Sequence, residues 1–101
     1  FNAVSDVDEE DINLSGFNLG QNYPNPFNPT TKISWYSSVG GHQTLKIYNI
    51  LGIEVGTLVD EYKPAGSYEV DFDASNLSSG VYLYKLQSGG NIITKKMTLI
   101  K

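Results

Sequence analysis

The sequence has no cysteine, no arginine and only one histidine. Without cysteine, the chain can form no disulfide, no thiolate metal site and no cysteine nucleophile. Without arginine, it has no guanidinium to hold a phosphate with two hydrogen bonds, and a single imidazole cannot serve zinc sites that need two. The net charge of −4 argues against nucleic acid as a partner. The composition therefore excludes disulfide scaffolds, thiolate zinc sites and metal sites that need two imidazoles.

Long apolar runs are absent as well. No stretch of roughly 18 apolar residues occurs, so no segment is expected to cross a bilayer as a helix. The first residues also lack the pattern of a signal peptide. The sequence starts at Phe1 rather than at methionine, and we expect it to be the C-terminal piece of a longer protein whose signal lies upstream.

The acidic residues are concentrated near the N-terminus. Five of the eleven acids lie between Asp6 and Asp11, whereas residues 14–101 carry six acids and seven lysines, a net of +1. Crowded like charges favour an extended, solvated chain, so residues 1–16 are predicted to be an acidic linker from an upstream domain. A calcium loop is the alternative, but Asp11 stands where an EF-hand needs glycine, and no glutamate closes the loop.

Proline and asparagine dominate the middle of residues 14–31. A residue that precedes proline is biased toward extended or polyproline conformations, and the prolines here are Pro24, Pro26 and Pro29. Because a polyproline helix repeats about every three residues, we expect two faces: Asn22, Asn25 and Asn28 on one, and Pro24, Phe27 and Thr30 on the other. Phe27 is the expected anchor into the core. The segment is thus predicted to be a rigid, ordered arm that leads into a strand.

From residue 31 onward, apolar residues alternate with polar ones, which is the period of a β-strand. Turn residues separate these runs, which are rich in β-branched and aromatic side chains. The expected strands lie near 17–21 and at 31–38, 43–49, 53–59, 66–73, 80–88 and 91–100. A helical stripe fits part of residues 47–62, but Gly52 and Gly56 would each cost a helix about 1 kcal/mol. A hairpin with Gly52 at its turn is therefore predicted there.

Short strands at this spacing, without crossover helices, predict an all-β fold: an immunoglobulin-like antiparallel β-sandwich of about seven strands over residues 17–101. Immunoglobulin-type domains place a tyrosine at the corner before strand F, two residues ahead of a core cysteine. Tyr82 occupies that corner position, and Tyr84 stands where the cysteine would be. Asp73 and Ser75 are expected to organise the preceding turn through side-chain to backbone hydrogen bonds.

No arrangement of residues indicates catalysis. His42 lies in a Gly-Gly-His segment that is expected to be a solvated loop, and no G-x-S-x-G nucleophile motif accompanies it. Asp71 and Asp73 fall on one strand face, without an apolar pocket to raise a pKa. Lys95 and Lys96 are interpreted as charges that protect a strand edge. The domain is therefore predicted not to be an enzyme.

Four segments occur in an order that resembles a known family. They are LGQNYPNPFNPTT at 19–31, LKIYNILGIEVGTLV at 45–59, the stretch from Ala65 to the Ser-Gly-Val-Tyr block at 79–82, and the terminal KKMTLIK. Together they resemble the type A C-terminal sorting domain of the type IX (Por) secretion system. The turn glycines Gly52 and Gly80 are kept, whereas Ile53 replaces a usual arginine and Asn76 a usual glycine.

The resemblance implies a transport address and not a catalyst. Domains of this kind end large secreted proteins, which are carried from the periplasm across the outer membrane to the cell surface or beyond. The implied partners are the translocon, its shuttle proteins and a sortase-like protease, together with a cargo domain upstream in the same chain. The resemblance implies no cofactor.

Strand addition is a physical route by which such a domain could be recognised. A last strand with free backbone donors and acceptors can pair with a strand of a receptor, and side-chain pockets add selectivity. The candidate recognition residues are Lys95, Lys96, Met97, Leu99, Ile100 and Lys101. The residues expected to be structural are Asn22, Pro24, Asn25, Pro26, Phe27, Asn28, Pro29, Gly52, Asp73, Gly80 and Tyr82.

Two other functions stay open on the residues alone. An aromatic platform built from Tyr36, Tyr48 and Tyr62 could stack on sugar rings, which would make the domain a carbohydrate-binding module of a secreted enzyme. A passive spacer is the remaining possibility, and its removal would leave export unchanged.

Overall fold

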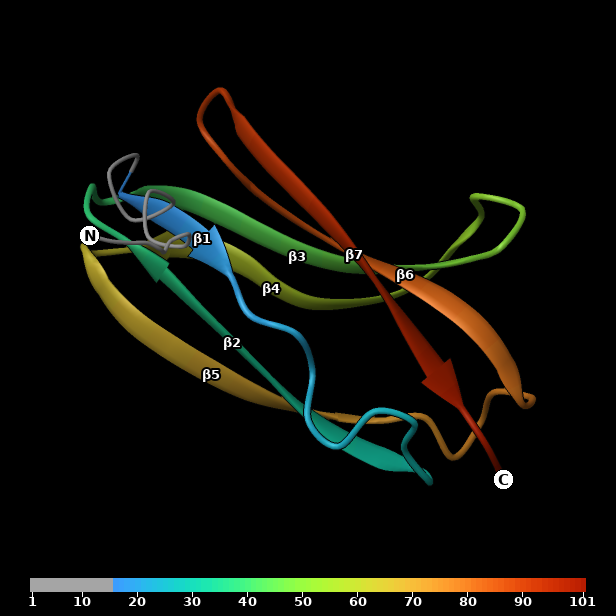
Figure 1. Ribbon diagram of the computed structural model, residues 1–101. Helices are drawn as coiled ribbons and strands as arrows, with labels where there is room; N and C mark the ends of the chain where they lie inside the picture. The colour runs from blue at the N-terminus through green and yellow to red at the C-terminus, as the bar shows by residue number, and fades with distance from the viewer. Residues whose placement is uncertain (1–15) are drawn as a thin grey trace, which may run out of the picture.

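The computed structural model describes residues 16–101, and its regular elements are β-strands (Figure 1). They are β1 (Phe17–Leu19), β2 (Thr30–Ser37), β3 (Gly41–Asn49), β4 (Glu54–Lys63), β5 (Gly66–Asp73), β6 (Gly80–Ser88) and β7 (Asn91–Leu99). The predicted all-β class is confirmed. The predicted acidic linker and the calcium alternative fall almost wholly on residues 1–15, outside the described residues. Within residues 16–101 there is no apolar helix of membrane-spanning length.

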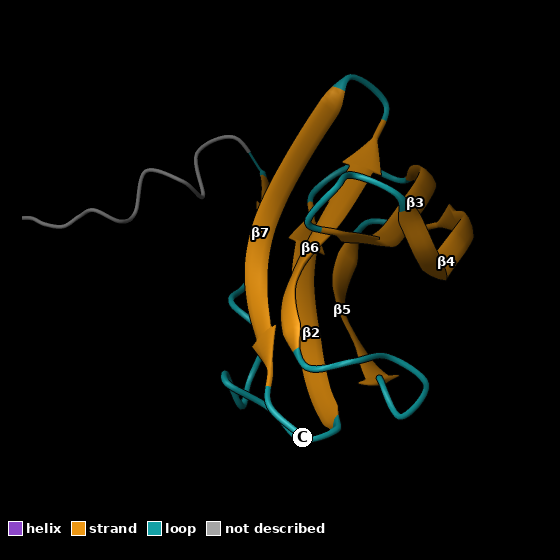
Figure 2. Cartoon of the chain, turned by 90° about the vertical axis from the view of Figure 1, so that its right-hand side faces the viewer, coloured by secondary structure: helices purple, strands orange, loops and turns teal. Residues whose placement is uncertain are grey.

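The strands form two antiparallel sheets that pack into a sandwich (Figure 2). One sheet has the order β1-β2-β5 and the other β4-β3-β6-β7. β2 pairs with β5, although β3 and β4, which lie between them in sequence, belong to the other sheet. The two sheets correspond to strands A-B-E and C′-C-F-G of an immunoglobulin-like domain. The strand order therefore confirms the predicted sandwich.

The alternation of the sequence determines which side chains fill the space between the sheets. Along β2, every second residue from Thr31 to Ser37 is buried, and the residues between them are exposed. A buried hydrogen bond joins the sheets: Nε1 of Trp35 on β2 donates to Oε1 of Gln43 on β3 at 2.9 Å. All the strands contribute to the apolar core, which consists of Phe17, Leu19, Phe27, Ile33, Trp35, Leu45, Ile47, Val59, Phe72, Ala74, Tyr82, Tyr84, Leu86, Met97 and Leu99.

β3 and β4 form the predicted hairpin and not a helix. Gly52 in its turn has a φ of +84°, a left-handed conformation that glycine adopts without steric cost. β4 continues to Lys63, beyond the predicted end at Val59. The apolar alternation stops at Val59 because β4 is an edge strand, whose later residues Asp60 and Glu61 are exposed.

Phe27 reaches the core from outside the strands, as predicted. Its side chain is 2% exposed, and its ring packs against that of Phe72 with the centroids 6.2 Å apart.

We expect Phe27→Ala to lower the free energy of unfolding by about 3–5 kcal/mol, because it removes a buried ring and leaves a cavity. Urea and thermal unfolding measure this loss. The matched control is Tyr23→Ala, in the same segment, where the side chain is 80% exposed and little is lost. Equal unfolding midpoints for Phe27→Ala and the parent chain would show that the ring is not an anchor.

Candidate functional site

Residues 20–29, which we call the arm, connect β1 to β2 and pair with the end of β7. Phe27 N donates to the Thr98 carbonyl at 3.0 Å, and Ile100 N donates to the Phe27 carbonyl at 2.9 Å. Oδ1 of Asn25 accepts a hydrogen bond from Thr98 N at 2.9 Å. Phe27 and Leu99 thereby form a parallel β-bridge. The arm acts as a short additional strand along the edge of β7 that faces away from β6.

The arm is not the regular polyproline helix that the sequence predicted. The predicted asparagine face is wrong, because Asn22 is buried while Asn25 and Asn28 are exposed. The other face is wrong as well, since Phe27 is buried between the exposed Pro24 and Thr30. The physical reason is that the arm pairs with two strands: Tyr23 forms an antiparallel bridge with Lys32, and Phe27 then bridges to Leu99. The peptide bonds before Pro24, Pro26 and Pro29 are cis.

A buried polar network fixes the start of the arm. Nδ2 of Asn22 donates to Oγ1 of Thr31 at 3.0 Å and to the Pro24 carbonyl at 3.1 Å. The Tyr84 hydroxyl accepts from Asn22 N at 2.8 Å and donates to the Gly20 carbonyl at 2.7 Å. Burial raises the pKa of Tyr84 above its ordinary value, although the hydrogen bond from the Asn22 amide acts in the opposite direction. The hydroxyl therefore stays protonated at neutral pH and keeps both roles.

Sequence reasoning missed this network. It placed Tyr84 correctly at the position of the core cysteine, but gave it no partner. A signal was present in Thr31, a polar residue at a core position in the alternation of β2. A buried hydroxyl needs a partner, and the arm supplies it through the Pro24 carbonyl, which accepts from Oγ1 of Thr31 at 2.8 Å.

The loop between β5 and β6 holds the very end of the chain. Nζ of Lys101 donates to the carbonyls of Ser75 and Leu77, at 2.7 and 2.8 Å. The backbone N of Lys101 donates to Oγ of Ser79 at 2.9 Å. Because the arm also binds Ile100, both final residues are fixed to the folded domain.

The predicted hydrogen bonds of this loop are confirmed. Oδ1 of Asp73 accepts from Ser75 N at 2.9 Å and also from the Ser75 hydroxyl. The Tyr82 hydroxyl donates to the Ser78 carbonyl at 2.7 Å, which is the predicted tyrosine corner. Gly80 then begins β6, opposite Leu99 of β7. The loop is therefore held by side chains at both ends.

The six candidate recognition residues divide into two groups. The side chains of Met97 and Leu99 are 0% and 1% exposed, so a receptor that binds the folded domain cannot reach them. Exposed or partly exposed side chains remain at Lys95, Lys96, Ile100 and Lys101. The sequence predicted strand addition at this end of β7. The folded domain blocks it, because the arm already occupies this edge of the strand. We call the exposed surface formed by residues 20–29 and 96–101 the arm–strand surface.

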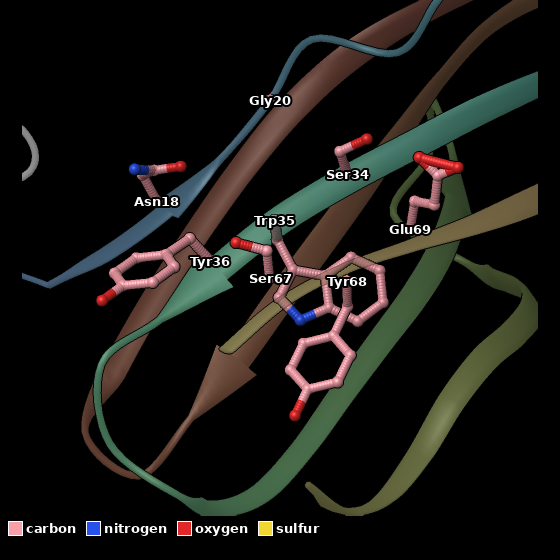
Figure 3. Close-up of a pocket in the computed structure, with 8 residues that line it drawn as sticks. All are labelled: Asn18, Gly20, Ser34, Trp35, Tyr36, Ser67, Tyr68 and Glu69. Atoms are coloured by element: carbon pink, nitrogen blue, oxygen red, sulfur yellow. The ribbon is translucent and has the colours of Figure 1, made fainter. Parts of the chain in front are cut away.

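The three tyrosines proposed as a sugar platform do not come together. Tyr36 lies on β2, in the first sheet, whereas Tyr48 and Tyr62 lie on the second sheet. On that sheet Tyr48 pairs with Glu54 at one end of the β3–β4 hairpin, and Tyr62 pairs with His42 at the other. In the hollow of Figure 3, Tyr36 is the ring on the outer face, while Trp35 is buried and Tyr68 packs against the core. Within residues 16–101, these three tyrosines therefore form no common aromatic face of the kind that this alternative requires.

The rejected catalytic candidates are exposed surface pairs. His42 was predicted to lie in a loop. It lies in β3 instead, because this strand begins at Gly41. Its Nε2 lies 2.6 Å from Oδ1 of Asp60 on the neighbouring strand, with both side chains exposed. Asp71 pairs with Lys32 at 3.1 Å on the outer face of the first sheet. Within residues 16–101, no three carboxylate or imidazole groups gather as they would around a metal.

We expect Tyr84→Phe to destabilise the chain by about 1–3 kcal/mol, because the Gly20 carbonyl and the Asn22 amide lose their buried partner. Hydrogen exchange at Asn22 N should also become faster, which links the loss to the arm. Tyr36→Phe, which removes a hydroxyl from an exposed position, is the control. Unchanged exchange at Asn22 in Tyr84→Phe would contradict the role of this network.

We expect Asp73→Asn to weaken the loss of stability at acid pH. Hydrogen bonds from the Ser75 hydroxyl and amide hold the pKa of Asp73 below its ordinary value of 3.8 in the folded chain. The ionised carboxylate therefore contributes stability above pH 3.8, and the contribution disappears as the pH falls through the lower, folded pKa. Urea unfolding at a series of acid pH values measures the slope.

Ser75→Ala is the companion variant, because it keeps the carboxylate and removes the largest cause of the lowered pKa. Its slope should lie between those of the parent chain and Asp73→Asn. If Asp73→Asn and the parent have the same slope, the turn carboxylate does not contribute in this way.

Comparison with known proteins identifies a family for this chain. A family model, described as the secretion system C-terminal sorting domain, matches residues 21–101. No curated protein matches the chain. The matched range includes most of the arm, β2 to β7, the β5–β6 loop and the terminal lysine. The chain therefore belongs to the family of C-terminal sorting domains of the type IX secretion system.

Proposed function

We propose that the type IX secretion machinery recognises this domain by its folded arm–strand surface, and not by a linear terminal peptide. The domain is a sorting signal for type IX secretion, which brings a larger protein across the outer membrane to the cell surface or the extracellular space. Members of the family are non-catalytic, and they imply a cargo upstream. The partners we propose are the translocon, a shuttle protein and a sortase-like protease, met after export of the cargo to the periplasm.

The observation that carries this proposal is the state of the terminal backbone. The amide groups of Thr98, Ile100 and Lys101 donate to Asn25, to Phe27 and to Ser79 within the domain. A receptor strand could pair with Thr98 and Ile100 only after the arm had been displaced, and with Lys101 only after its bond to Ser79 had been broken. Displacing the arm would also expose the ring of Phe27, a large apolar group. Recognition of the intact surface avoids this cost.

The exposed side chains of the arm–strand surface are suited to such a contact. Ile100 is 53% exposed and lies next to the bound end of the chain. Lys96 is exposed on β7, and its carbonyl accepts a hydrogen bond from Nε2 of Gln21 at 2.9 Å. The backbone of β7 near these side chains is paired with β6 on one side and with the arm on the other. Ile100 and Lys96 therefore present a fixed shape to a receptor.

An export assay tests the proposal. The 101-residue chain is fused to a secreted reporter in a bacterium with a type IX system, and surface or extracellular reporter is measured. We expect Ile100→Ser to reduce export strongly while the variant keeps the unfolding midpoint of the parent. Ile92→Ser, at the other end of β7 and with a similar exposed fraction of 55%, is the matched control and should be exported normally.

Deleting residues 97–101 should abolish export, but it also removes the core side chains of Met97 and Leu99. A reporter that carries only residues 91–101 makes the sharper test. Export by that peptide alone, or normal export of Ile100→Ser, would overturn recognition of the folded surface. Normal export after deletion of the whole domain would favour a passive spacer.

A further inference from the structure

The tip of the β3–β4 hairpin carries an unusual set of exposed apolar side chains. Ile50, Leu51, Ile53 and Val55 are 73%, 79%, 56% and 38% exposed. Figure 1 shows the turn of this hairpin at one side of the molecule, apart from the β5–β6 loop and the end of β7. Scattered apolar residues are normal on a protein surface, but several on one short turn indicate a surface that binds an apolar partner.

The turn is rigid, although it is exposed. Oδ1 of Asn49 accepts from Leu51 N at 2.9 Å and from Ile53 N at 3.0 Å. Two backbone hydrogen bonds close the same turn, from Asn49 N to the Ile53 carbonyl and from Gly52 N to the Asn49 carbonyl. The aliphatic side chains are therefore held outward, and little conformational freedom is left to lose on binding.

Behind the tip, the outer face of the second sheet is aromatic and then basic. Tyr48 of β3 pairs with Leu83 of β6, and both are partly exposed. In the next row, Lys46 of β3 stands directly opposite Lys85 of β6. Nζ of Lys85 lies 5.1 Å from the centroid of the Tyr48 ring. The hairpin thus runs from an aliphatic tip through an aromatic row to a pair of cations.

The lysine pair is costly without an external anion. Like charges directly opposite each other on neighbouring strands destabilise a sheet. Glu54 lies 3.5 Å from Nζ of Lys46 and offsets part of this charge. Lys96 adds another cation to the same face, because it pairs with Leu83 on the other side. An anionic partner over this face would relieve the repulsion.

We propose that the β3–β4 hairpin docks on a bilayer that contains anionic phospholipids, with Ile50, Leu51 and Ile53 inserted at the headgroup–acyl boundary and Lys46 and Lys85 bound to phosphate groups. Binding to a bilayer interface depends on buried apolar area together with attraction between basic residues and anionic lipids. A pocket of a protein partner could bind the apolar tip without using the lysines behind it. An anionic bilayer uses both the aliphatic tip and the pair Lys46 and Lys85, so we favour the bilayer as the partner. Docking of this kind does not depend on whether the secretion machinery recognises the arm–strand surface.

The position of the chain entry fits this orientation. Gly16 and Phe17 line one hollow together with Gly41 and His42, at the start of β3. The tip follows Asn49, at the opposite end of the same strand. A strand of this length spans roughly 27 Å. Gly16, where the described part of the chain begins, therefore lies at the end of the domain that points away from the bilayer.

Vesicle co-sedimentation of the 101-residue chain tests the proposal. We expect binding to phosphatidylcholine vesicles with about one-third phosphatidylglycerol, weaker binding when salt is added, and little binding to phosphatidylcholine alone. Leu51→Asp should abolish binding. Val39→Asp is its matched control, since Val39 is 69% exposed and lies in the turn at the other end of β3, and it should bind like the parent.

Lys46→Gln and Lys85→Gln should each weaken binding about fivefold, the effect of one lysine at an anionic surface. Removing like charges should not unfold the sheet, and thermal unfolding verifies this. Lys32→Gln and Lys63→Gln remove the same charge elsewhere and are the controls. Absence of binding to anionic vesicles, equal binding to neutral vesicles, or equal losses in test and control variants would each overturn the proposal.

Discussion

The rest of the structure depends on the backbone pairing between Phe27 and the end of β7. The Phe27 amide and carbonyl bind Thr98 and Ile100, residues that lie about seventy positions later in the sequence. This pairing covers the edge of β7, places the Phe27 ring in the core and fixes the end of the chain. An unpaired β-edge is a site of unwanted association, so a sorting domain that ends in an apolar strand gains from a built-in cover.

The domain lacks the disulfide that joins the sheets of antibody domains, and hydrogen bonds take part of that role. Tyr84, at the cysteine position, binds through its hydroxyl the start of the arm, where Gly20 N donates to the Ser34 carbonyl of β2 in the other sheet. Trp35 and Gln43 make a second, direct link between the sheets. Paired buried polar groups favour one arrangement of a fold over its alternatives. The pairing at Gln43 is partial, because its Oε1 accepts from Trp35 while its Nε2 is buried without a partner. Their chemistry does not depend on the redox state of the compartment that the domain crosses.

The periodic part of the fold and the burial of Phe27 could be predicted from the sequence, and the conformation of the arm could not. Strict alternation along β2, together with the turn at Gly52, defined the strands and the sandwich. The tyrosine corner at Tyr82 followed from local spacing. The burial of Phe27 was predicted, but the path of the arm was not, because distant partners decide it: Asn22 bonds to Tyr84 and Thr31, and the Phe27 backbone pairs with β7. The local sequence pattern does not reveal these distant contacts. The pairing between the arm and β7 also covers the edge of β7 that was predicted to be available for strand addition.

Amide hydrogen exchange at Thr98 and Ile100 tests the central claim most directly. The pairing with the arm predicts that both amides exchange as slowly as those in the middle of β6, and that Phe27→Ala speeds them together. Rapid exchange at both positions in the unmodified chain would show that the terminal strand has a free edge. Recognition by strand addition would then become the better explanation of sorting.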